Sequence, residues 1–276
     1  MTNAVLSIAH ALSADYQALI WDSFFAQKQR GVDFHTHFPW AHTAPGDCAF
    51  GLLRHEGKLL AGATMRLHRS PRGNQWAALG LICVAPAYRG QGLSTALLEG
   101  SLAWLASSGT TRTVLWTNKP AVYTKVGFVL DDSSLFGWVA KEGPCYPPTV
   151  PAHVRSWPDE EERNGANRGL PAFCHGAQRW IAAERAASAI VLLDGLGPIV
   201  AEWSGPDEAV ATLLADALAP RWRLNALRTD SLPLALARRG LQVELNPLSL
   251  QMARSLEKPG EAAFQELSQL RVLDRV

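Results

Sequence analysis

Two glycines in the turn Arg89-Gly90-Gln91-Gly92 separate an apolar run from an amphipathic segment. The run covers residues 79–84 and is cut by Pro86. Gly90 and Gly92 carry no side chain that would hold a ligand away from the backbone. The helix expected next begins with unpartnered amides and with the positive end of its dipole. A strand, turn and helix of this kind suit a pyrophosphate, and a loop without a ligand is the alternative.

A second candidate for chemistry is Tyr123, which stands four residues before Gly127 in the segment NKPAVYTKVGF, residues 118–128. A phenol can donate a proton and yet stays neutral near pH 7, so it is suited to act as a general acid. The alternative is a core tyrosine that makes a structural hydrogen bond.

Both segments resemble motifs of the GNAT family of acyl-CoA N-acyltransferases. The family's phosphate-binding pattern, Gln/Arg-x-x-Gly-x-Gly/Ala, is met by Arg89 and Gly92, and Ser94 departs from it at the last position. The context Val-x-Pro-x-x-Arg-Gly-x-Gly, which begins at Val84, strengthens the match. Residues 118–128 resemble, in compressed form, the later motif Asn-x-x-Ala-x-x-x-Tyr-x-x-x-Gly-Phe.

The resemblance implies direct transfer of acetyl from acetyl-CoA, as co-substrate, to an amine, without a covalent intermediate and without a metal. Tyr123 would protonate the departing thiolate. Backbone groups near Cys83 and Val84 would bind the pantetheine arm and polarise the thioester carbonyl. The residues implied to bind the cofactor are Ile82, Cys83, Val84, Arg89, Gly90, Gln91, Gly92, Leu93, Ser94 and Asn118.

The general base is left open, because the strand before the turn has no carboxylate where many relatives carry a glutamate. His35, His37 or His42 could take the proton through water, and histidines without a catalytic role are the alternative. Their spacing also admits a metal, but no carboxylate or cysteine cluster completes a site. The aromatic loop that holds His35 and His37, residues 34–40, falls where relatives line the acceptor cleft. We expect the Cys83 thiol, on an apolar strand, to pack rather than react.

The 276 residues are 47% hydrophobic and 18% charged, with a net charge of +1. This length fits two domains, and the charge gives no reason to expect nucleic acid or a membrane as a partner. Four scattered cysteines indicate a reducing compartment. No apolar run reaches the roughly 20 residues of a spanning helix, and no secretion signal is seen. We therefore expect a cytoplasmic monomer or homodimer.

Residues 1–142 are expected to form the GNAT domain, a mixed α/β fold whose central mixed sheet is flanked by helices and splays for the pantetheine. Hydrophobic periodicity predicts helices at 14–30, 92–106 and 120–126, a hairpin of strands at 49–55 and 59–68, and further strands at 77–84, 113–117, 128–130 and 134–140. The proline-rich residues 143–158 predict an extended linker.

Residues 159–276 predict a second, smaller GNAT-like domain. Its expected elements are two strands within 188–203, helices at 207–218 and 232–239, and strands at 222–227, 241–244 and 249–252. Leu236 stands at the position of Tyr123 in this half. Val84 and Gly127 are 43 positions apart, whereas Trp203 and Gly240 are 37 apart. The shortening falls on the segment that corresponds to the turn Arg89-Gly90-Gln91-Gly92, which we call the phosphate turn. This half therefore keeps the fold pattern without the site; an unrelated α/β domain is the alternative.

Together these features favour acetyl transfer to the amine of a small molecule. A protein N-terminus or a lysine side chain is the alternative acceptor. A non-enzymatic alternative is an acyl-CoA sensor, in which the intact site binds the ligand and the second half relays its presence.

Overall fold

The computed structural model describes residues 4–43, 47–69, 73–141, 152–184, 186–218, 220–257 and 269–275. The chain folds into two compact units. Unit 1 spans residues 1–132, 250–268 and 275–276, and unit 2 spans residues 133–249 and 269–274. None of the helices in the described part of the chain combines the length and the apolar character needed to cross a bilayer.

Unit 1 is built on a mixed sheet in the order β1-β2-β3-β4-β5-β14-β6. Only β4 and β5 run parallel among the neighbours in the described sheet. The strands are β1 (Val5–Ala9), β2 (Cys48–His55), β3 (Lys58–Arg69), β4 (Gln75–Val84), β5 (Thr110–Trp116), β14 (Gln251–Ser255) and β6 (Val129–Leu130).

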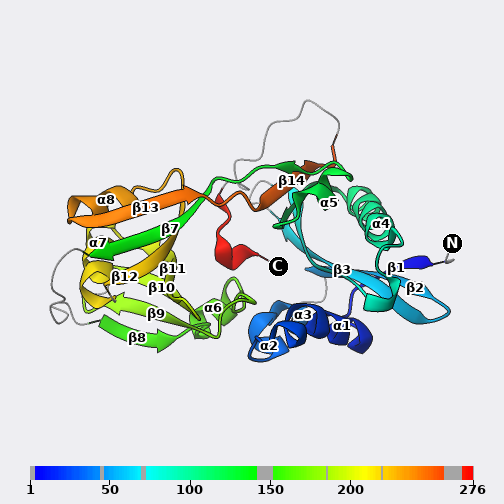
Figure 1. Ribbon diagram of the computed structural model, residues 1–276, viewed down its shortest axis with the longest axis horizontal. Coiled ribbons are helices and arrows are strands. Elements are labelled where there is room, and N and C mark those ends of the chain that lie inside the picture. Colours follow the sequence, from blue (N-terminus) through cyan, green and yellow to red (C-terminus); the bar gives the residue numbers. More distant parts are fainter. Residues whose placement is uncertain are drawn as a thin grey trace. The chain divides into compact units, whose positions relative to one another are not determined.

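Two helices cover opposite faces of this sheet (Figure 1). Helix α4 (Leu93–Ser107) buries leucines at 98, 102 and 105, whose three- and four-residue spacing keeps them on one side. Helix α1 (Ala14–Phe24) buries Tyr16 and Ile20. The shorter elements are η1 (Ala26–Lys28), α2 (Phe34–His37), α3 (Trp40–Thr43), η2 (Pro86–Tyr88) and α5 (Pro120–Thr124).

A bulge bends β4 just before its end. Gly62 on β3 pairs with Cys83, and Thr64 pairs with Gly80, so Leu81 and Ile82 together oppose one residue of β3. Leu81 takes a φ of 50°, which is rare for a branched side chain. The fully buried Tyr16 of α1 holds it there, since its hydroxyl donates to the Leu81 carbonyl at 3.0 Å and lies 3.1 Å from Thr64 Oγ1.

Strands β4 and β5 separate after Ala78, just before this bulge. Their pairing joins Gln75–Ala78 to residues 110–114, and no further pair between the two strands is found in the described residues. The end of β4 from Leu79 to Val84 therefore keeps β3 as its partner on one side only. This is the splay that the resemblance led us to expect.

Unit 2 repeats the architecture, with sheet order β13-β7-β12-β11-β10-β9-β8 and a parallel pair at β11 and β12. Its strands are β7 (Ser134–Lys141), β8 (Ala152–Ser156), β9 (Gly176–Ala182), β10 (Ser188–Asp194), β11 (Gly197–Ser204), β12 (Arg221–Leu227) and β13 (Leu241–Pro247). Its helices are α6 (Glu160–Asn164), α7 (Asp207–Ala217), α8 (Leu232–Arg238) and η4 (Val272–Asp274). The chain thus has the expected fold class, two mixed sheets flanked by helices.

The two units exchange one strand each. Strand β7 follows β6 in the sequence but lies between β12 and β13 in unit 2. Strand β14 follows β13 but lies between β5 and β6 in unit 1. Apart from this exchange the two sheets have the same strand order, which is the pattern expected of an internal duplication.

The units consequently differ from the predicted ranges 1–142 and 159–276. Alternating apolar residues show that 134–140 is a strand, but local pattern carries no information on which sheet accepts it. Residues 152–156 of the expected linker form strand β8, and residues 142–151 lie outside the described part. The helix expected over 14–30 ends at Phe24, because η1 follows and Gln29 turns left-handed at a φ of 48°.

Candidate active site

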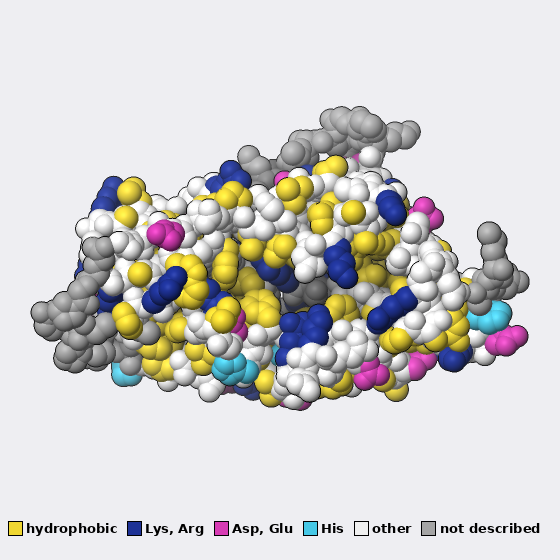
Figure 2. All heavy atoms as spheres, in the orientation of Figure 1, with side chains coloured by type: hydrophobic (Ala, Val, Ile, Leu, Met, Phe, Trp, Pro, Cys, Tyr) yellow, Lys and Arg dark blue, Asp and Glu magenta, His cyan; other side chains and the backbone are white. Residues whose placement is uncertain are grey.

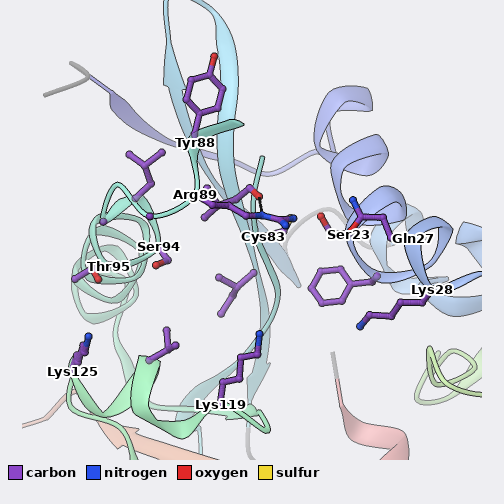
Figure 3. Close-up of a pocket in the computed structure, with 17 residues that line it drawn as sticks. Ser23, Gln27, Lys28, Cys83, Tyr88, Arg89, Ser94, Thr95, Lys119 and Lys125 are labelled. Atoms are coloured by element: carbon purple, nitrogen blue, oxygen red, sulfur yellow. Dashed lines mark hydrogen bonds between the residues drawn. The ribbon is translucent and has the colours of Figure 1, made fainter. Parts of the chain in front are cut away.

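A cavity of about 780 Å³ opens where β4 ends in unit 1. The phosphate turn and the start of α4 form one wall, and the end of α1 with η1 forms another (Figure 3). The residues that line it are Ser23, Phe24, Gln27, Lys28, Ile82, Cys83, Val84, Tyr88, Arg89, Gly90, Gly92, Leu93, Ser94, Thr95, Lys119, Val122 and Lys125.

The phosphate turn presents bare backbone to this cavity. Gly90 and Gly92 have φ values of 78° and 76°, which side-chain-bearing residues rarely adopt. A Cβ added at either glycine would meet no atom within 4 Å, so both face open space. Gly92 is the N-cap of α4, and its carbonyl accepts from the amides of Thr95 and Ala96. The earlier amides of the first turn have no preceding helical carbonyls to bind, which leaves them for an anion.

The cavity is electropositive. Lys28, Arg89, Lys119 and Lys125 line it, and none of the described lining residues is acidic. Burial lowers the pKa of Lys28, and the positive charges of Arg30 and Lys119 lower it further. Lysine and arginine side chains are also visible over this unit in Figure 2. A site of this charge favours a polyanionic ligand.

Comparisons with known proteins identify the fold. The sequence model of the acetyltransferase (GNAT) family matches residues 14–128. These residues form a GNAT domain. They include the turn, α4 and Tyr123. Among curated protein sequences, no relative matches the chain.

Solved structures extend the likeness to both units. A probable N-acyltransferase of unknown function from Enterococcus faecalis has a TM-score of 0.65 and 14% identity, over 92% of this chain and 73% of its own. A GCN5-related N-acetyltransferase from Anabaena variabilis has a TM-score of 0.62 and 13% identity, with the same coverage. A tandem GNAT protein of clavulanic acid biosynthesis has a TM-score of 0.58 and 11% identity, over 94% of this chain and all of its own. The second unit therefore has a GNAT-like fold.

Most residues expected to bind the cofactor line the cavity of the GNAT domain. They are Ile82, Cys83, Val84, Arg89, Gly90, Gly92, Leu93 and Ser94. Gln91 and Asn118 are exposed and are not among the described lining residues, although residues beside each of them are. The Arg89 guanidinium Nε donates to the Val84 carbonyl at 3.2 Å, which ties the turn to the end of β4.

The wall formed by α1 and η1 could not be predicted from the sequence motifs. Ser23, Phe24, Gln27 and Lys28 lie about sixty positions before the turn, and only the tertiary packing of α1 on β3 and β4 brings them to it. In the helix predicted over 14–30, the four-residue spacing of Ser23 and Gln27 would place both on one face, which is the only local signal available.

The Cys83 thiol is a packing group. It is buried, and burial raises its pKa to about 12. A protonated thiol is a poor nucleophile. Cys48 and Cys174 are also buried and free, and Cys145 lies outside the described residues.

Tyr123 is half-buried and packs against the core of the GNAT domain. Its ring meets Phe128 edge-on, with 6.3 Å between centroids. Burial raises its pKa, and a hydrogen bond with Thr117 opposes that shift. The neighbouring residues Lys119 and Val122 line the cavity, whereas Tyr123 is absent from the described lining. The phenol is therefore protonated at neutral pH and lies next in sequence to Val122 of the cavity wall.

The predicted aromatic loop is in fact two short helices, α2 and α3. The Asp33 carboxylate caps α2 by accepting from the Thr36 amide at 2.8 Å. His37 is buried, and its Nε2 accepts from the Val32 amide at 3.0 Å, so it has a structural role. His35 is exposed, and the side chain of His42 lies outside the described part. The described lining of the cavity includes no histidine.

The other aromatic residues of this stretch lie away from the phosphate turn. Phe38 and Trp40 are buried. Phe34 lines a second cavity of about 510 Å³ on the outer face of α1, together with Trp21. Among the described residues, no group of three histidine, cysteine, aspartate or glutamate side chains is placed to hold a metal ion.

Unit 2 has lost the corresponding anion site. The first turn of α7 carries Asp207 and Glu208 where the GNAT domain offers bare amides. The Asp207 carboxylate accepts a hydrogen bond from the Ser231 hydroxyl. Leu236, at the position of Tyr123, is fully buried in the core of unit 2. Negative side chains at a helix N-terminus repel a phosphate, so the described start of α7 offers no equivalent cradle.

Proposed function

We propose that this chain is an acyl-CoA-dependent N-acyltransferase that moves acetyl from acetyl-CoA to the amine of a small molecule. Membership of residues 14–128 in the GNAT family supports acyl transfer in general. The observation that carries the proposal is the electropositive cavity that joins the phosphate turn to the splayed end of β4. The cytoplasmic location that we propose is supported by the free thiols of Cys48, Cys83 and Cys174.

The residues of the cavity fit coenzyme A. The amides of the turn at Gly90–Ser94 would hold the pyrophosphate, and the open space beside both glycines lets phosphate oxygens approach the backbone. Arg89 and Lys125 would balance the remaining phosphate charge. The edge of β4 near Ile82–Val84 has no strand partner on the β5 side. The amide groups of pantetheine would hydrogen-bond to this edge as a neighbouring strand does.

Bound acetyl-CoA supplies an activated acyl group whose C–S bond breaks as the amine nitrogen forms the new C–N bond. The backbone at the end of β4 would orient the thioester carbonyl for this attack. The Tyr123 hydroxyl would then deliver its proton to the sulfur. Its raised pKa keeps that proton available at neutral pH.

No described side chain that lines the cavity is a histidine or a carboxylate. We therefore propose that the acceptor amine loses its proton to water rather than to a dedicated base. The rate should then rise with pH until the free amine predominates, as expected when the acceptor itself must be deprotonated.

The placement of Tyr123 outside the described lining favours one further candidate, a non-catalytic acyl-CoA sensor. Both functions require acetyl-CoA binding, but only the enzyme releases free thiol. Incubation with acetyl-CoA and a panel of amines, followed by a thiol assay, separates them. Thiol release that depends on an amine supports the transferase. Tight binding of acetyl-CoA without thiol release, whichever amine is offered, supports the sensor.

Tyr123→Phe tests the acid directly, because it removes one hydroxyl and keeps the edge-on contact with Phe128. General acid catalysis contributes about 10²–10⁴-fold to rate, so kcat should fall by about that factor. Affinity for acetyl-CoA should change little, since the turn carries the phosphate contacts. A kcat within threefold of the parent value would remove Tyr123 from the mechanism.

A further inference from the structure

The wall of the cavity formed by α1 and η1 carries a cation, Lys28, to which the proposed function assigns no phosphate contact. The Lys28 ammonium lies over the Phe24 ring, 5.8 Å from its centroid. Arg30 also contacts Phe24, because its Nε donates to the Phe24 carbonyl at 2.9 Å. In Figure 3, Lys28 and Lys119 extend toward the cavity from different sides.

The charge of Lys28 is held without a counterion. No ion pair to Lys28 or Lys119 is found in the described part of the chain, and the lining described above holds no carboxylate. The like charges of Arg30 and Lys119 act on Lys28 and lower its pKa, after burial, which is the larger cause. Of these cations Lys28 and Lys119 line the cavity, and their mutual repulsion falls when an anion binds between them.

The position of Lys28 indicates which part of the substrates would meet it. Lys28 shares its wall with Ser23, which hydrogen-bonds to the Cys83 thiol at the end of β4. That end is where the proposed function places the thioester. In coenzyme A the sulfur and the 3′-phosphate lie on opposite sides of the pyrophosphate. A cation at the thioester end therefore faces the reacting groups and not the 3′-phosphate.

We propose that Lys28 is a specificity residue that binds an anionic group carried by one of the two reacting partners, and that this group is a carboxylate on the acceptor or on the acyl chain. Lys119 completes the site from the other wall. The proposal rests on the proposed function of the same cavity. It narrows the acceptor from any small amine to amines of the amino-acid type, unless the carboxylate resides on the acyl group.

The test compares the full chain with its Lys28→Gln variant on matched substrates. The acceptor arm uses pairs that differ only in a carboxylate, lysine with cadaverine and tyrosine with tyramine. The acyl arm uses acetyl-CoA against succinyl-CoA. The coenzyme arm measures binding of CoA and dephospho-CoA by calorimetry. Lys141→Gln, a lysine substitution in unit 2, is the matched control.

A charge-assisted hydrogen bond supports an effect of about tenfold, so Lys28→Gln should raise KM about tenfold for the carboxylate-bearing member of one arm. KM for the member without the carboxylate, and both values in Lys141→Gln, should stay within twofold. Titration of the amines into the protein saturated with CoA gives the same comparison without turnover. Equal effects on the members with and without the carboxylate, no effect, or an effect confined to CoA over dephospho-CoA would each overturn the proposal.

Failure of the proposed function has a different signature. In that case the parent protein would bind neither acetyl-CoA nor CoA, or would bind them and release no thiol with any amine. If CoA binds, thiol is released and neither arm shows selectivity for the carboxylate-bearing member, the specificity proposal fails while the coenzyme site stands.

Discussion

Tyr16→Phe is the most informative single change in the GNAT domain, because it removes one atom at the point that shapes β4. The hydroxyl of Tyr16 donates to the Leu81 carbonyl and lies beside Thr64 Oγ1, at 3.0 and 3.1 Å. All of these groups lie in the buried interior, and the ring also meets Phe50. Phenylalanine keeps the ring contacts and leaves the two oxygen atoms without the phenol.

The magnitude follows from burial. A buried polar group that loses its partner costs about 1–3 kcal/mol. In a protein of this size each kcal/mol lowers Tm by about 2–4 °C, so Tm should fall by about 2–12 °C. Leu81 would also lose the contact that holds its left-handed φ of 50°. Since Ile82 and Cys83 follow it into the cavity, affinity for acetyl-CoA should fall as well, by up to about tenfold.

Differential scanning calorimetry and isothermal titration with acetyl-CoA measure the two effects. Thr64→Val and the double variant complete a cycle with Tyr16→Phe, and the two changes should be less than additive because they share one hydrogen bond. A Tm within 1 °C of the parent, together with unchanged affinity, would refute the idea that this phenol maintains the bulge.

Three further predictions follow from the same geometry. Gly92→Asp should abolish acetyl-CoA binding, measured by calorimetry. Gly57→Asp is the control, because Gly57 has a matching φ of 79° and equally open space, and it should lower stability without loss of binding. Equal binding in both variants would contradict the pyrophosphate site proposed at the turn. A chain that ends at residue 148 lacks β14 and should aggregate or be inactive, so a soluble fragment with full thiol release would contradict the strand exchange. The hydrogen bond from Arg54 lowers the pKa of Asp15 from 3.8 to about 2. The ionised Asp15 therefore stabilises the fold above about pH 4, and this stabilisation is lost as the pH falls toward 2. Asp15→Asn should lack this part of the acid dependence of Tm.

Local sequence pattern was sufficient for most elements of the two halves. The predicted strand at 77–84 and helix at 92–106 became β4 over Gln75–Val84 and α4 over Leu93–Ser107. The repeat was also visible, since α8 begins at Leu232 as predicted. These segments are periodic and end at glycine or proline, which makes their limits local properties.

The long-range pairings were not encoded locally. Strands β7 and β14 have similar alternation, and either could complete either sheet as far as periodicity is concerned. The bulge at Leu81 carries no sequence signal, because its cause is the hydroxyl of Tyr16, 65 positions away. The α1 wall of the cavity was missed for the same reason, and the histidines of residues 34–40 were emphasised because exposure cannot be judged from residue type.

The exchanged strand gives the second half of the chain a direct role at the site. Strand β14 lies between β5 and β6, the two strands that flank α5 and its Tyr123. The Asp132 carboxylate accepts from the amides of Leu250 and Gln251 at 2.7 and 3.0 Å, and the Arg254 guanidinium donates to the Val126 carbonyl. Strand β6 has only two residues and would have little to pair with without β14. The second half of the chain lacks a phosphate turn of its own, but its strand β14 holds in place the segment that carries the proposed acid, Tyr123. The fold of this half can therefore be required even though it has no site of its own.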